Sequence, residues 1–168
     1  MKISIRIRSD MLRGMRADLA RPHAHAWERV GFMTAAATAS PSEVLLLVRE
    51  YRPVADEDYR HSTGVGAEIG SEAFRKALQW AYQPKSALIH IHTHHGTGKP
   101  NFSGTDLRSG KEFVPSFFAT VPRMPQGMIV LSDDSATGLL WLGEHEAPLE
   151  IDHFSQSGSN YRRDWTAL

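Results

Sequence analysis

Three histidines at alternate positions, His90, His92 and His94, are the side chains of this sequence best suited to metal chemistry. They alternate with isoleucine and threonine across residues 89–94, a pattern that predicts a β-strand. On a strand, side chains two residues apart share a face at a spacing of about 7 Å, so two imidazoles can converge on one ion. The spacing permits His90 with His92 or His92 with His94. We favour the second pair because it lies nearer the turn that leads to a further candidate ligand.

That further ligand is the carboxylate of Asp106, which follows a turn rich in glycine and proline. The segment from Ser103 to Asp106 predicts the beginning of a helix, with Ser103 as the N-cap and Asp106 in the first turn. A strand, a turn and a helix can fold back so that this carboxylate faces the two imidazoles. The three ligands would then be His92, His94 and Asp106, which leaves the fourth tetrahedral position for water, as expected of catalytic zinc.

The composition narrows the possible chemistry. The chain of 168 residues has no cysteine, which excludes disulfides, thiol catalysis and thiolate zinc sites and leaves nine histidines and the carboxylates as ligands. Nineteen basic residues balance nineteen acidic ones, so the net charge favours neither nucleic acid nor a membrane surface as a partner. The N-terminal residues alternate apolar with polar and do not resemble a signal peptide. We therefore expect a cytoplasmic protein with one domain over residues 1–168.

The periodicity of apolar residues predicts a mixed α/β domain with a central sheet flanked by helices. The expected strands span residues 2–8, 28–38, 43–51 and 87–93, and a final hairpin joins strands at 127–132 and 137–143. The expected helices span residues 11–20, 71–81 and 103–113, the last broken before Pro115. Residues 52–70 are predicted to form a loop with room for one short strand, and residues 150–168 to form a partly ordered tail.

Three segments together resemble a known family. Glu28 in Glu-Arg-Val-Gly-Phe-Met, His92-x-His94, and Ser103-x-x-Asp106 are similar to the JAMM motif of the JAB/MPN metalloproteases, particularly the small prokaryotic members. The resemblance spans about residues 25–145 and implies the cytidine-deaminase-like fold of that family. Two features depart from the pattern: His95 stands where proline is usual, and the loop from His94 to Ser103 is one residue longer than in the familiar eukaryotic members.

The resemblance also implies roles for these residues. His92, His94 and Asp106 would bind Zn²⁺, Glu28 would act as general base and acid, and Ser103 would help to hold the oxyanion. The implied activity is that of a zinc metallopeptidase or isopeptidase that processes or removes a ubiquitin-like β-grasp protein, beside an E1-like activating enzyme. Related members occur in bacterial antiphage defence. Two alternatives remain, namely a non-catalytic scaffold that binds a partner and a hydrolase of small-molecule amides with the same fold.

Other polar clusters receive simpler interpretations. His23 and His25 have ligand spacing but no accompanying Ser-x-x-Asp segment, so we interpret them as loop or supporting residues. His95 points to the face of the strand opposite His92 and His94 and is interpreted in the same way. The acidic run at residues 56–58 is predicted to be a solvated loop.

Overall fold

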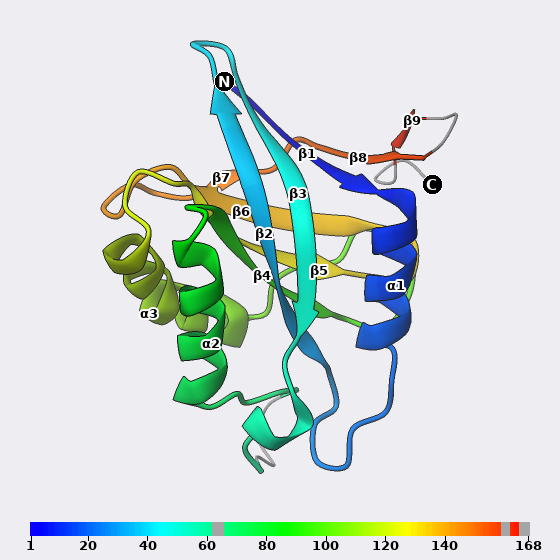
Figure 1. The fold of residues 1–168 in the computed structure, drawn as a ribbon. Coiled ribbons are helices and arrows are strands. Elements are labelled where there is room, and N and C mark those ends of the chain that lie inside the picture. The colour runs from blue at the N-terminus through cyan, green and yellow to red at the C-terminus, as the bar shows by residue number, and fades with distance from the viewer. Residues whose placement is uncertain (62–65, 159–161, 165–168) are drawn as a thin grey trace.

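A computed structural model describes residues 1–61, 66–158 and 162–164, the last three in backbone only. Nine strands form one curled, mixed sheet in the order β7-β6-β5-β4-β2-β3-β1-β8-β9. Helix α1 covers one face of the sheet, and α2 and α3 cover the other, as Figure 1 shows. The predicted mixed α/β class with a sheet flanked by helices is confirmed.

The elements lie close to their predicted positions over most of the chain. The helices are α1 (Ser9–Leu19), α2 (Ser71–Tyr82) and α3 (Gly104–Thr120), with a short 3₁₀ helix η1 (Asp56–Asp58). The strands are β1 (Lys2–Arg8), β2 (Val30–Ala39), β3 (Glu43–Pro53), β4 (Ala87–Thr93), β5 (Gln126–Leu131), β6 (Ala136–Trp141), β7 (Leu149–Glu150), β8 (His153–Ser157) and β9 (Arg162–Asp164). The loop predicted at residues 52–70 contains η1 and an isolated bridge between Tyr59 and Ile69. Residues 62–65 of that loop lie outside the described part of the chain.

Alternation along β4 divides its side chains between the two layers of the protein. Ile89 and Ile91 are fully buried on the α1 face, in a cluster with Leu12, Met15 and Leu19 of α1. Leu88 belongs to the cluster under α2 and α3. Because side chains alternate along a strand, His90 and His92 share the α2/α3 face with Leu88. The two candidate ligand pairs therefore point toward α2 and α3 and away from α1.

Two predicted boundaries are wrong. Helix α3 continues through Pro115 to Thr120 and is not broken before the proline. Proline removes one backbone hydrogen bond and disfavours a continuing helix, but the turns on either side bury Val114, Phe117 and Phe118, and this burial offsets the loss. Strand β2 begins at Val30, so Glu28 lies two residues before the strand and not within it.

The first part of the predicted tail is ordered. Strand β8 pairs in parallel with β1 and inserts Phe154, only 1% exposed, into the core. Asp152 adds a hydrogen bond of 2.7 Å from the N–H of Ile3 to its carboxylate. Residues 159–161 and 165–168 of the tail lie outside the described residues.

None of the described helices has the length and hydropathy needed to span a membrane.

Candidate metal centre

The antiparallel register between β2 and β4 explains how two distant segments meet at the site. Val30 lies opposite His92, Gly31 opposite Ile91 and Phe32 opposite His90. Continuing this register two residues before Val30 places Glu28 opposite His94. The backbone of His94 is itself held in line with the sheet, because its N–H donates to the carbonyl of Leu131 at 2.8 Å.

The structure brings together the carboxylates of Glu28 and Asp106 and the imidazoles of His92 and His94. Nε2 of His92 lies 3.4 Å from Oδ1 of Asp106, and Nε2 of His94 lies 3.5 Å from Oδ2 of the same carboxylate. The Glu28 carboxylate also lies close, with Oε1 at 3.8 Å from Nε2 of His94. Glu28, His92 and His94 each offer a ligand atom within 4.8 Å of the others. Asp106 meets the two imidazoles with different oxygens.

Burial of His92 supplies a test of whether a metal fits here. The residue is 3% exposed, and neither ring nitrogen has a hydrogen-bond partner among the described residues. A buried polar atom without a partner is costly, and a bound ion is one of the few ways to satisfy it. The donor set of imidazoles and carboxylates suits a divalent transition metal such as zinc. These residues therefore fit a metal, although Nδ1 of His92 would still lack a partner among the described groups.

Asp106 is fixed in place by the beginning of α3. The hydroxyl of Ser103 accepts the N–H of Asp106 at 3.1 Å, and the N–H of Ser103 donates to Oδ2 of Asp106 at 2.6 Å. This reciprocal capping box confirms the N-cap interpretation of Ser103. Partial burial would raise the pKa of Asp106, but the His92 imidazole and the Ser103 groups outweigh it, and the pKa is lowered. The carboxylate is thus ionised and oriented toward both imidazoles.

His90 is packed among aromatic side chains. Its ring packs against Phe113, with centroids 5.1 Å apart, and against Phe32 at 5.6 Å. Burial lowers the pKa of His90 to about 3, so the ring is neutral near neutral pH. Of the two histidine pairs, His92 and His94 are the ones that face Asp106 and Glu28.

The backbone of Glu28 is anchored by a neighbouring loop. The carbonyl of Gly66 accepts the N–H groups of Trp27 at 2.7 Å and of Glu28 at 3.1 Å. A Cβ on Gly66 would lie 2.5 Å from the Glu28 carboxyl carbon, so any larger residue at position 66 would displace the end of this side chain. The position of the Glu28 carboxylate therefore depends on residue 66.

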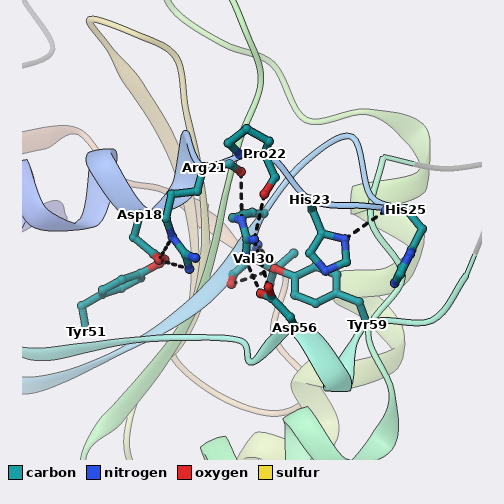
Figure 2. A network of polar contacts seen from close by, with 10 residues as sticks. Asp18, Arg21, Pro22, His23, His25, Val30, Tyr51, Asp56 and Tyr59 are labelled. Carbon is teal, nitrogen blue, oxygen red and sulfur yellow. Dashed lines mark hydrogen bonds and ion pairs between the residues drawn. The ribbon is translucent and has the colours of Figure 1, made fainter.

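Arg29 anchors the same segment from inside. It is 3% exposed and donates to the carbonyls of Arg21 and Pro22, each at 2.9 Å, and to Oδ1 of Asp56 at 2.7 Å. The hydrogen bond with Asp56 raises the pKa of Arg29 and lowers that of Asp56. Figure 2 shows the surrounding network, in which the hydroxyl of Tyr59 accepts the N–H of Val30 at 2.7 Å.

The acidic run at residues 56–58 is therefore not a simple solvated loop. Asp56 pairs with buried Arg29, and Asp58 is 8% exposed and lies 2.7 Å from Nζ of Lys76 on α2. These two ion pairs connect η1 to the segment that carries Glu28 and to α2. Arg29 is next to the predicted base Glu28 in the sequence. Its anchoring role could not be predicted, because the sequence does not show that Arg29 pairs with Asp56.

The loop after His94 is held by the turn between β5 and β6. The N–H of Gly98 donates to Oδ1 of Asp134 at 2.7 Å, and the hydroxyl of Ser132 donates to the carbonyl of Gly98 at 2.7 Å. Arg16 on α1 in turn donates to the backbone carbonyls of Ser132 and Asp133. These hydrogen bonds hold the loop that contains His95 and Gly98 against the β5–β6 turn. Nothing in the sequence spacing points to Asp134.

Two hollows flank Glu28. One is a cleft of about 720 Å³ between α2 and α3, with Glu28, His92 and Asp106 among its lining residues. The other, of about 640 Å³, is lined by His23, His25, His61 and His95. The rings of His25 and His61 stack at 5.4 Å. No three of these four histidines, as far as the described residues go, place ligand atoms within 4.8 Å of one another.

Comparison with known proteins identifies no family. No family model matches the chain, and no curated protein matches it. Among solved structures, the N-terminal domain of STIL from Trichoplax adhaerens is 12% identical, with a TM-score of 0.47 over 82% of this chain and 42% of that one. The chain thus spans less than half the length of that neighbour, and a likeness this distant establishes neither a common fold nor a common function.

Proposed function

We propose that this chain is a zinc-dependent metallopeptidase or isopeptidase of the JAB/MPN type. The observation that carries the proposal is the meeting of Glu28 with His92, His94 and Asp106 from three separate segments. At their centre the buried ring nitrogens of His92 have no hydrogen-bond partner among the described residues. The order of elements agrees with the resemblance of the motif, since β2, α2, β4, α3 and the final hairpin follow one another as that family requires.

Each residue of the proposed site has a distinct chemical role. His92, His94 and Asp106 would hold the ion, and zinc bound there would supply a Lewis acid that polarises a carbonyl and lowers the pKa of water to about 7. Glu28 takes a proton from the attacking water and returns it to the leaving amine, because its carboxylate lies beside the ligands without belonging to a hydrogen-bonded cap. The hydroxyl of Ser103 remains able to donate, since its capping bond to Asp106 uses it as an acceptor. It can therefore assist the developing oxyanion.

The substrate class rests on the motif alone. Proteins with a JAMM motif of this kind cleave peptide or isopeptide bonds of ubiquitin-like β-grasp proteins. They often work beside an E1-like enzyme, and in bacteria some take part in antiphage defence. We extend that substrate class to this chain as part of the proposal. A partner-binding scaffold without catalysis and a small-molecule amide hydrolase are the alternatives, and both are separable by experiment.

The test compares two substitutions in protein purified without added metal. Glu28→Gln should abolish hydrolysis of a ubiquitin-like fusion while zinc content remains near one ion per chain, whereas His94→Ala should lose both. Zinc is measured by elemental mass spectrometry and cleavage by mass spectrometry of the products. Glu57→Gln, at an exposed carboxylate of η1, is the matched control and should behave as wild type.

Each alternative has its own signature. A wild-type rate for Glu28→Gln would refute the proposed role of Glu28. A chain that purifies without zinc and cleaves nothing would be a scaffold. Cleavage of small amides with the fusion left intact would identify the small-molecule hydrolase.

A further inference from the structure

The cleft between α2 and α3 begins at the metal centre and extends away from it. Glu28, His92 and Asp106 lie among its lining residues, together with Phe74 of α2 and Phe113 of α3. A volume of about 720 Å³ lies within the range of pockets that bury a ligand larger than one side chain. A substrate whose scissile carbonyl reaches the centre can therefore continue into this cleft.

The cleft is lined mainly by apolar side chains that the fold leaves only partly covered. Phe74, Leu78, Phe113 and Ile69 are each half-buried and line the cleft, while Met128 forms part of the lining as a fully buried side chain. The rings of Phe74 and Phe113 lie 5.5 Å apart between centroids. A ligand side chain that entered here would remove aromatic and aliphatic surface from water on several sides at once.

The charges around the cleft are predominantly negative. Glu28, Glu68, Asp106 and Glu112 line it, against the single guanidinium of Arg75 among the described lining residues. Arg75 is already engaged, since its Nε and Nη2 lie 2.8 Å and 2.6 Å from the carboxylate oxygens of Glu72. Apart from the metal centre itself, a carboxylate on the ligand would meet Glu68 and Glu112 and no unpaired guanidinium among the described lining residues.

From these observations, we propose that this cleft is a specificity subsite that takes a large apolar side chain of a peptide substrate next to the scissile bond and rejects an acidic one. The inference rests on the proposed function for the placement of the scissile bond. The preference itself follows from the lining of the cleft and can be measured without turnover.

The experiment measures binding of three short peptides to the zinc-loaded Glu28→Gln protein by calorimetry. The peptides are acetyl-Gly-X-Gly-amides in which X is Phe, Ala or Asp, and all lack a free carboxyl terminus. The Phe peptide should bind at least tenfold more tightly than the Ala peptide, and the Asp peptide should show no measurable binding. Equal affinities for the three peptides would overturn the inference.

Two variants locate the binding to the cleft. Phe113→Ala should weaken binding of the Phe peptide at least tenfold while zinc content is unchanged. Because Phe113 also packs against Phe117, the charge reversal Glu112→Arg at an exposed position provides a test that does not disturb the core. It should bring the Asp peptide into the measurable range, whereas Glu57→Arg, outside the cleft, should not. Failure of Glu112→Arg to change the preference would contradict the subsite.

The two proposals can fail separately. If Glu28→Gln retained full activity, the hydrolytic mechanism would be refuted, while the measured preference for Phe over Asp would still support the subsite. If all peptides bound alike and Glu28→Gln remained inactive, the subsite would be refuted and the proposed hydrolase would remain supported.

Discussion

Replacing Gly66 with alanine should separate catalysis from folding and from metal binding. A Cβ at this position would lie 2.5 Å from both Cδ and Oε2 of Glu28 and 2.8 Å from Oε1. Ordinary van der Waals contact needs at least 3.4 Å, so the carboxylate must move by about 1 Å. The displaced atoms are the far end of a flexible side chain, and we expect the free energy of unfolding to change by less than about 1 kcal/mol.

The effect on activity should be much larger. The Glu28 backbone cannot retreat with its side chain, because its N–H donates to the carbonyl of Gly66 itself. Misplacement of a catalytic group by about 1 Å costs on the order of 100-fold in rate. We therefore expect kcat to fall about 100-fold with zinc content unchanged, measured by cleavage kinetics beside elemental analysis.

The same variant distinguishes two roles for Glu28. If Glu28 is the general base, its displacement should leave zinc bound. If Glu28 is a zinc ligand, its displacement should release the ion, so loss of zinc from Gly66→Ala would refute the assignment of Glu28 as the base. Full activity would refute the close approach. Gly14→Ala is the matched control, because a Cβ there meets nothing within 4 Å on helix α1. It should leave kcat unchanged and stabilise the fold by about 0.5–1 kcal/mol.

Three further predictions follow from contacts away from the reacting groups. Asp134→Ala should weaken zinc affinity about tenfold in a competition titration by freeing the Gly98 N–H, whereas Asp134→Asn, which keeps the acceptor, should not. Phe154→Ala should destabilise the fold by about 3–5 kcal/mol in urea unfolding, since the ring is 1% exposed; a change under 1 kcal/mol would show that β8 is peripheral. Burial raises the pKa of Tyr51, helped by its hydrogen bond to Asp18. The unfolded chain ionises this phenol first, so stability should fall as pH rises beyond about 10, and less steeply in Tyr51→Phe.

The arrangement of His92, His94 and Asp106 was largely predictable from local sequence. Alternation places the two histidines on one face, His92 within β4 and His94 one residue after its end. The Ser-x-x-Asp spacing places the carboxylate in the first turn of a helix, where it is found in a capping box. Both relations act over two to four residues and hold wherever the strand and the helix form. The choice between the two histidine pairs needed the position of α3, which places Phe113 beside His90 and Asp106 beside His92 and His94.

The supporting contacts could not be predicted in this way. Arg29 and Asp56 are charged residues on a loop, and their sequence does not show that one is buried against the other. Asp134 lies 36 residues from Gly98, which its carboxylate holds. Strand β8 was missed because it is short and gains its stability by pairing with β1 at the other end of the chain.

The sequence by itself therefore determined the types of the candidate ligands, the elements that carry them and the mixed α/β class, since these depend on periodicity and capping. The tertiary structure alone decided that Glu28 meets His94, because that contact depends on the register between β2 and β4, set by the pairing of Val30 with His92. A shift of one residue would turn every side chain of a strand to the other face. It also decided that the centre opens into an apolar, acidic cleft, because α2 and α3 come together over the sheet only in the folded chain.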